Sequence, residues 1–464
     1  MRKFLKICLL LWVSSIFTAY SQQQKTNVIV IVVDDAGYAD FGCYGGKEIP
    51  TPNINQIAKN GTLFTDAYVT ASVCAPSRAA MLTGLYQQRF GFEHNTSSKP
   101  SPGYKLSDVG IAKNVPTIGN QMKANGYRTI AIGKWHQGDT EPYFPMNRGF
   151  DEFYGFIGGH RNFFAYDKVP SREAMLFNNR EIVPESQVTY LTDMFTDKAS
   201  DFIVKNKSNP FFMYLAYNAV HTPMNAKKSS MQKFAHLPEG RRAYAAMMVA
   251  LDEGIGKVIQ TLKDQQLYDN TLIFLINDNG AATNNNADNG KLRGLKGSKW
   301  EGGIRVAFLM QWPGKVPAGN VYHNMVSSLD ILPTAVAASN GKFVEKFVPD
   351  GKNLVPFIDR NNRKKPHEAL FWRRGVAAAV RKDKWKIIKA GDNPLLLFDL
   401  SKDTSETTNL ALKKPKKVKE LLRELQQWEQ KMDKPHWFSD YGDSNQLMKH
   451  RMEVVGREME RKYP

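Results

Sequence analysis

The sequence predicts an α/β fold: a large, mostly parallel sheet sandwiched by helices, followed by a smaller C-terminal α+β subdomain built on an antiparallel sheet. Two observations support this class. Continuous apolar runs rich in β-branched residues, such as residues 27–33, alternate with helical patterns up to about residue 350, and strands buried on both faces are typical of parallel sheets. Beyond residue 350, short strands joined by tight polar turns replace this alternation.

The predicted elements follow in chain order. The strands of the large sheet are apolar runs that end in polar residues, at 27–33, 128–132, 211–217, 271–276 and 306–311. The clearest helical patterns between them lie at 116–125, 191–204 and 242–262. In the C-terminal part, strands are expected at 369–373, 377–381, 385–389 and 395–400, and an amphipathic helix at 415–432.

The length of 464 residues and a hydrophobic content of 42% allow a sizeable core, which excludes a wholly disordered chain. We expect four segments: a signal peptide at 1–21, a catalytic domain at 22–350, a C-terminal subdomain at 351–434 and a charged tail at 435–464. No internal repeat is visible.

The first 21 residues have the features of a secretory signal peptide. Arg2, Lys3 and Lys6 precede a run of about 11 apolar residues, which is too short to span a bilayer core. We therefore expect export, to the periplasm or the medium, and no membrane span. Without these three basic residues the formal net charge falls from +18 to +15. A basic surface favours the binding of polyanions, and export argues against nucleic acid as the partner. The alternative is a basic surface that only keeps the protein soluble.

Two acidic pairs follow predicted strands of the large sheet. Asp34 and Asp35 end the first strand, and Asp278 and Asn279 follow the strand at 271–276. The carboxyl ends of parallel strands meet at one edge of a sheet, where several carboxylates repel one another unless a cation holds them. Oxygen ligands without thiolate or imidazole favour Ca²⁺ or Mg²⁺. The alternative is an ordinary pair of turn formers.

A second constellation starts at Cys74, which is followed by Ala-Pro-Ser and then Arg78. This run opens a predicted helix, whose N-terminus and arginine together favour an anion. Only Cys43 and Cys74 remain after signal cleavage, too few for a disulfide framework. A buried structural cysteine is the alternative.

These segments belong to an ordered series that resembles the type I, formylglycine-dependent sulfatases of the alkaline-phosphatase-like superfamily. The cysteine signature at 74–78 is highly specific, because a modifying enzyme reads it. The remaining matching blocks are TPNI at 51–54, GKWH at 133–136, RGFD at 148–151, HTP at 221–223, DNG at 278–280, LRGLKG at 292–297 and EGGIRV at 301–306. The resemblance spans almost the whole chain after the signal peptide and implies the fold described above.

The resemblance also implies the chemistry. Cys74 would be oxidised to formylglycine by a formylglycine-generating enzyme, and one hydroxyl of the hydrated aldehyde would attack the sulfur of a sulfate ester. The other hydroxyl would then allow sulfate to leave as the aldehyde reforms. The calcium ligands would be Asp34, Asp35, Asp278 and Asn279, completed by the group at position 74.

Further roles follow residue by residue from the same resemblance. Arg78 would steady the hydrate. Lys134, His221 and Lys296 would hold sulfate oxygens, with His221 and Lys296 as acid candidates for the leaving oxygen and His136 as the base of the elimination step. Taken singly, these residues would be surface lysines and core histidines.

The general character of the chain resembles polysaccharide sulfatases of bacteria that degrade sulfated algal glycans. We expect ulvan or carrageenan fragments as substrate, with glycosaminoglycans or aryl sulfates as the next choice. Aromatic and basic residues suit sugar rings and anionic groups; the candidates are His94, His160, Arg161, Trp372, Arg373 and Arg374. A phosphoester hydrolase of the same superfamily would usually present Ser or Thr where Cys74 stands. A non-catalytic glycan-binding relative would be expected to lack part of the catalytic set.

Overall fold

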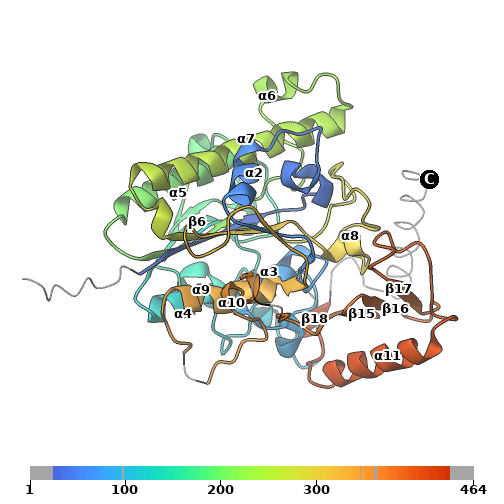
Figure 1. The fold of residues 1–464 in the computed structure, drawn as a ribbon. Coiled ribbons are helices and arrows are strands. Elements are labelled where there is room, and N and C mark those ends of the chain that lie inside the picture. The colour runs from blue at the N-terminus through green and yellow to red at the C-terminus, as the bar shows by residue number, and fades with distance from the viewer. Residues whose placement is uncertain (1–24, 97–98, 345, 360–361, 363, 439–464) are drawn as a thin grey trace, which may run out of the picture.

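A computed structural model of the chain describes residues 25–96, 99–344, 346–359, 362 and 364–438. The predicted signal peptide and the part of the predicted tail from residue 439 onward lie outside the described residues. Figure 1 shows a central sheet with helices on both sides and a second, smaller unit beside it. Within the described residues, no helix combines the length and apolar character needed to cross a bilayer.

Ten strands form the large sheet in the order β12-β2-β11-β10-β1-β9-β5-β6-β7-β8. Its five middle strands, from β10 to β6, are parallel to one another. The strands are β1 (Asn27–Val33), β2 (Thr62–Phe64), β5 (Arg128–Lys134), β6 (Glu152–Phe156), β7 (Phe177–Asn178), β8 (Glu181–Ile182), β9 (Phe211–Ala216), β10 (Thr271–Asn277), β11 (Phe308–Gln311) and β12 (Asn320–Tyr322). The predicted parallel core of the fold is therefore confirmed.

The bounds of most predicted strands of the large sheet differ by one or two residues from those observed, and the strand predicted at 306–311 is antiparallel to its neighbour β10. β11 begins at Phe308, two residues later than expected, and runs antiparallel to β10. The connection from β10 contains only the four-residue helix α8 (Glu301–Ile304) and no long crossover helix. The chain therefore re-enters the sheet from the edge where β10 ended, which makes β11 antiparallel.

Helices cover both faces of the sheet (Figure 1). On one face α2 (Pro52–Lys59), α5 (Leu191–Lys205) and α7 (Glu239–Asp264) pack with one set of alternate β1 side chains, and on the other face α3 (Cys74–Thr83), α4 (Ile118–Ala124) and α9 (Ile331–Ala338) pack with the other set. Every residue of β1 is buried, as its unbroken apolar run predicts. Shorter helices include α6 (Lys228–Gln232), which contacts α7, and α10 (Val355–Ile358), whose Ile358 packs in the core of the second face.

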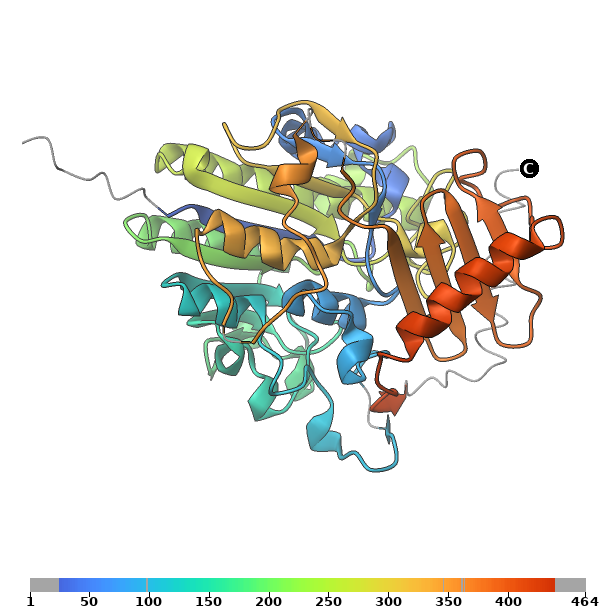
Figure 2. The same cartoon turned by 60° about the horizontal axis from the view of Figure 1, so that its bottom comes forward.

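The smaller unit is the predicted antiparallel sheet. Its strands β14 (Ala369–Arg374), β15 (Ala377–Lys382), β16 (Trp385–Ala390) and β17 (Leu396–Asp399) pair in chain order. Figure 2 shows α11 (Pro415–Glu429) lying across one face of this sheet. The other face packs against the large domain, where Trp372 and Phe398 join Tyr68 and Trp300 in one core cluster.

Two short strand pairs complete the fold. β3 (Ala67–Tyr68) pairs with β13 (Val326–Ser327), and β4 (Lys99–Pro100) pairs with β18 (Trp437–Phe438). The second pair places the first residues of the predicted tail against a loop of the large domain. In the large sheet, the carboxyl ends of β10, β1, β9 and β5 lie side by side, because these strands are consecutive neighbours.

Candidate active site

The two acidic pairs meet at this edge of the sheet. Val33 and Asn277, the last residues of β1 and β10, are paired in register, so the residues that follow them are adjacent. The backbone N–H of Asp35 donates to Asp278 Oδ1 at 3.3 Å, and Asn279 Nδ2 donates to Asp35 Oδ1 at 2.7 Å. The structure therefore brings Asp34, Asp35, Asp278 and Asn279 into one buried cluster.

Two oxygens of this cluster are suited to a cation. Asp34 Oδ1 and Asn279 Oδ1 are buried and have no hydrogen-bond partner, although buried polar atoms are nearly always paired. Burial and the neighbouring Asp34 carboxylate also raise the pKa of Asp278 to about 6. Crowded carboxylates with unused oxygens are a donor set that fits a hard divalent cation such as Ca²⁺.

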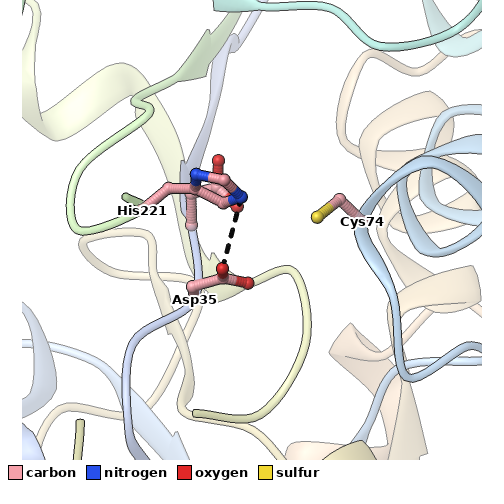
Figure 3. A group of neighbouring side chains, drawn as sticks. Asp35, Cys74 and His221 are labelled. Carbon is pink, nitrogen blue, oxygen red and sulfur yellow. Dashed lines mark ion pairs between the residues drawn. The ribbon is translucent and has the colours of Figure 1, made fainter. Parts of the chain in front are cut away.

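Cys74 is the first residue of α3, and its side chain faces the acidic cluster. Figure 3 shows its sulfur pointing towards Asp35 and His221 across the site. Ligand atoms of Asp34, Asp35, Cys74 and His221 lie within 4.8 Å of one another. The sequence did not predict His221 as a metal ligand, and its place here adds an imidazole to the possible set. Position 74 thus lies where a nucleophile and a cation could share a substrate.

Two buried cations balance the carboxylates. Arg78 Nε lies 2.8 Å from Asp278 Oδ2, and its Nη2 lies 3.5 Å from Asp34 Oδ2. Lys134 Nζ lies 2.6 Å from the same Asp34 oxygen. All of these side chains are fully buried. Because the carboxylates are fixed by buried charge-assisted bonds, the geometry of the cluster is rigid.

Lys296 links Asp35 to Cys74. Its Nζ donates to both carboxylate oxygens of Asp35, at 2.7 and 2.8 Å, and lies 3.0 Å from Cys74 Sγ. Burial opposes ionisation of the thiol, but the positive charges of Lys134 and Lys296 lower the pKa of Cys74 to about 6. The site therefore stabilises negative charge at position 74.

The surroundings shift the pKa values of the two predicted catalytic histidines in opposite directions. Burial and Lys134 oppose protonation of His221, but Asp35 and Asp34 raise its pKa above the ordinary value, and its Nε2 lies 3.4 Å from Asp35 Oδ2. Burial, Lys134 and Arg78 hold the pKa of His136 well below the ordinary value. His221 therefore favours the protonated form and His136 the neutral form.

These groups open into one cavity of about 650 Å³. Cys74, His136, His221 and Lys296 are among its lining residues, and the segment between β6 and β7 supplies much of its wall. The remaining lining residues are Asn95, Thr96, Leu106, Val109, Asp139, Ile157, Gly158, Gly159, His160, Tyr166, Pro170, Ser171, Glu173 and Ala174.

Of the six predicted sugar-binding residues, only His160 lines this cavity. Arg161 is buried and pairs with Glu185 at 3.0 Å. Trp372 is 1% exposed, and its indole N–H donates to the carbonyl of Val69 at 2.7 Å. The structure thus places these two side chains in the packed interior and not in the lining of the cavity.

The remaining three candidates also lie away from the cavity lining. Arg373 Nε donates to Glu93 Oε1 at 2.8 Å, so its charge is neutralised within the protein. Arg374 is 3% exposed on the buried face of β14. His94 is buried beside Phe438, with ring centroids 5.6 Å apart.

Two contributors to the site were not predicted. Asn285 Nδ2 donates to the carbonyl oxygens of Asp35 and Val220, at 2.9 and 3.2 Å, and so joins the end of the first strand to the loop of His221. Gly159 lies against the ring of His136: a Cβ there would be 2.7 Å from Cε1 and 2.8 Å from Nε2. The Gly-Gly-His run at 158–160 was the only sequence signal for this contact.

Comparisons with known proteins agree with this geometry. The profile of the sulfatase family matches residues 26–341. A second profile, described as the C-terminal part of N-sulphoglucosamine sulphohydrolase, matches residues 296–434.

Individual proteins show the same likeness. Human N-acetylgalactosamine-6-sulfatase is 32% identical over 352 residues, covering 72% of this chain and 66% of its own length. An uncharacterised sulfatase of Escherichia coli, YdeN, is 31% identical over 409 residues, covering 76% of this chain and 70% of its own length. A solved structure of Ps i-CgsB in complex with k-i-k-neocarrahexaose is 36% identical, with a TM-score of 0.84, and the match covers 95% of this chain and all of that one.

Proposed function

The chain belongs to the sulfatase family and is a sulfuric ester hydrolase, and we propose that its substrate is a sulfated galactan of the carrageenan type or its oligosaccharides. We further propose a formylglycine made from Cys74 as nucleophile and a calcium ion as cofactor. The observation that carries this proposal is the position of Cys74, which lines the cavity beside the acidic cluster and lies 3.0 Å from Lys296 Nζ.

Calcium would be held by Asp34, Asp35, Asp278 and Asn279, with the group at position 74 beside them. The unpartnered oxygens of Asp34 and Asn279 support this assignment. When bound, the ion supplies a positive charge that polarises a sulfate oxygen, and the formylglycine supplies a hydroxyl nucleophile.

The residues of the chain would hold the substrate and move its protons. Lys134 and Lys296, both already paired with carboxylates of the site, are cations that would bind sulfate oxygens and stabilise charge that develops on them. His221 has its Nδ1 2.6 Å from the carbonyl oxygen of Thr222, which fixes the ring with Nε2 towards the site. A protonated His221 would then give a proton to the leaving oxygen, and neutral His136 would take one from position 74.

The galactan proposal rests on the relative whose structure was solved with a neocarrahexaose, because that likeness spans nearly the whole chain. The formal net charge of +18, or +15 without the three basic residues of the predicted signal peptide, suits a polyanionic chain. A second candidate is a glycosaminoglycan, favoured by the likeness to N-acetylgalactosamine-6-sulfatase. Export by the predicted signal peptide would place the enzyme where either polysaccharide occurs.

The proposal is tested by measuring free sulfate with ion chromatography. Oligosaccharides of carrageenan, ulvan, chondroitin sulfate and heparin are incubated with the enzyme and calcium. We expect release from carrageenan that is lost in Cys74→Ala and kept in Cys43→Ala, the matched change at the other cysteine of the described residues. The mass of the peptide that contains Cys74 reports whether the aldehyde has formed.

Three results would contradict parts of this proposal. Unchanged release by Cys74→Ala would refute the nucleophile. Release from chondroitin sulfate or heparin alone would replace the galactan by a glycosaminoglycan. No release by an enzyme whose Cys74 peptide carries the aldehyde would refute all four substrate classes.

A further inference from the structure

No residue of the segment 301–306 lines the cavity. The first residue of this segment nevertheless carries a charge in the interior of the protein. Glu301 is fully buried, and its carboxylate accepts hydrogen bonds from Tyr68 Oη at 2.6 Å and from Lys386 Nζ at 2.8 Å. Removing charges from water costs several kcal/mol each, so a buried ion pair is expensive unless its geometry is well satisfied. The burial of the Glu301 carboxylate therefore needs a structural or functional reason.

Lys386 and Glu406 complete a buried triad with Glu301. Lys386 Nζ lies 2.8 Å from oxygens of both glutamates, and all three side chains are fully buried. Glu406 Oε2 also accepts a hydrogen bond from the backbone N–H of Glu301 at 2.7 Å. Lys386 comes from β16 and Glu406 from the loop after β17, so the C-terminal subdomain supplies two of the three members.

The triad is joined directly to the turn that carries Lys296. Arg293 Nη1 donates to the carbonyl of Glu406 at 2.7 Å, and its guanidinium lies 4.0 Å from the ring centroid of Trp300. The backbone N–H of Gly302, next to Glu301, donates to the carbonyl of Arg293 at 2.7 Å. The position of Glu406 therefore fixes both ends of the connection between Arg293 and Gly302.

The same segment also touches the loop after β10, which carries Asp278 and Asn279. The backbone N–H of Gly280 donates to the carbonyl of Gly303 at 3.2 Å, and a Cβ at Gly280 would lie 1.7 Å from the carbonyl oxygen of Gly302. Asn289 Nδ2 donates to the carbonyl oxygens of Gly302 at 2.7 Å and Gly294 at 3.0 Å. These contacts leave the backbone at 302–303 little room to move unless the loop of Asp278 and Asn279 moves with it.

We propose that Glu406 and Lys386 are positioning residues for the sulfatase reaction: through Glu301, Arg293 and Gly302 they hold the turn at 292–297 so that Lys296 reaches Cys74 and Asp35. The inference rests on the proposed role of Lys296. It gives the C-terminal subdomain a part in catalysis although neither residue lines the cavity.

The test compares Glu406→Ala with Glu406→Gln and with a structural control. Alanine removes the acceptor of the Glu301 N–H and the partner of Lys386, whereas the amide oxygen of glutamine can still accept the N–H bond. The control is Leu397→Ala on β17, a buried leucine that packs with α11 on the far face of the antiparallel sheet. It destabilises the same subdomain without touching the triad.

Two quantities are measured on folded proteins. We expect kcat to fall about 10- to 100-fold in Glu406→Ala, the scale for displacing a catalytic group by about 1 Å, to recover in Glu406→Gln and to stay near wild type in Leu397→Ala. Hydrogen exchange should show faster exchange of the Lys296 and Gly297 amides, which donate to the carbonyl oxygens of Ala281 and Ser72, in Glu406→Ala alone.

The outcomes separate this inference from the proposed function. Equal losses of kcat in Glu406→Ala and Leu397→Ala, or unchanged exchange at 296–297, would overturn the positioning role. If the wild-type enzyme released no sulfate, the proposed function would fail, and the exchange data would still decide whether Glu406 holds the turn.

Discussion

Gly159 offers a test of the proposed base because it touches His136 without taking part in chemistry. A Cβ at this position would lie 2.7 Å from Cε1, 2.8 Å from Nε2 and 3.3 Å from Nδ1 of the His136 ring. The backbone of Gly159 lies outside the left-handed region, so alanine fits its conformation. The substitution Gly159→Ala therefore acts on one thing, the space that the imidazole occupies.

The size of the effect follows from this geometry. Carbon atoms in contact are about 3.5 Å apart or more, so a methyl group at 2.7 Å must push the ring by about 0.8 Å. A misplacement of about 1 Å costs about 100-fold in rate, which is about 2.7 kcal/mol in activation free energy. We expect kcat to fall between about 10- and 100-fold, and the free energy of unfolding to fall by about 1–3 kcal/mol, because the added methyl group overpacks the space against the buried His136 ring.

The assay is steady-state sulfate release, with the melting temperature measured on the same samples. The control is a double-mutant cycle with His136→Ala: if Gly159 acts through the ring, its substitution has no further effect once the ring is gone. The reasoning would be refuted if Gly159→Ala kept the wild-type kcat, or if it slowed His136→Ala by the same factor as the wild-type enzyme.

Three further predictions concern the metal, the buried triad and Trp372. Chelation of calcium by EGTA should lower the melting temperature, since an ion at a hundred times its Kd contributes about 2.7 kcal/mol; an unchanged value would count against the metal site. Burial and Glu301 raise the pKa of Glu406 from 4.5 to about 7, so its contribution to stability is complete below the unfolded value and is lost as the pH rises through about 7. Glu406→Gln should accordingly flatten the fall in melting temperature between about pH 4.5 and pH 7, and equal slopes in both proteins would contradict this. Trp372→Ala should cost about 3–5 kcal/mol in urea unfolding and leave KM unchanged, because the ring packs 5.4 Å from Tyr68; a raised KM with full stability would restore it as a sugar contact.

The strand that leads to the site could be predicted because its signal is local. Residues 27–33 are apolar after Asn27, without a break, and β1 has the bounds expected for it. The direction of β11 could not be predicted in the same way, since it depends on the path of the chain after β10. The same reasoning explains the acidic pairs: each follows a strand end, so the topology brought them together once the strands were placed.

The predicted sugar-binding residues were chosen by residue type. Most of them are buried in the structure. Along β14 exposure alternates, so that Leu370, Trp372 and Arg374 point inward while Phe371 and Arg373 are half-exposed. The residues of β14, ALFWRR, show no alternation of apolar and polar types, so the buried face could not be read from the sequence; the pleat of the strand places Trp372 on the face of Leu370. The wall of the cavity comes from the irregular segment between β6 and β7, which also has no periodicity to read.

The charges of the site give a reason for a metal that is independent of the family. Three buried carboxylates, Asp34, Asp35 and Asp278, face three cations, Arg78, Lys134 and Lys296. The three cations are already bonded to the carboxylates, so the net positive charge comes from protonated His221, and more is missing where negative charge gathers on a reacting sulfate ester. A buried anion without a partner is costly. A divalent cation on the unpartnered oxygens of Asp34 and Asn279 would supply the missing charge, and it would do so next to position 74.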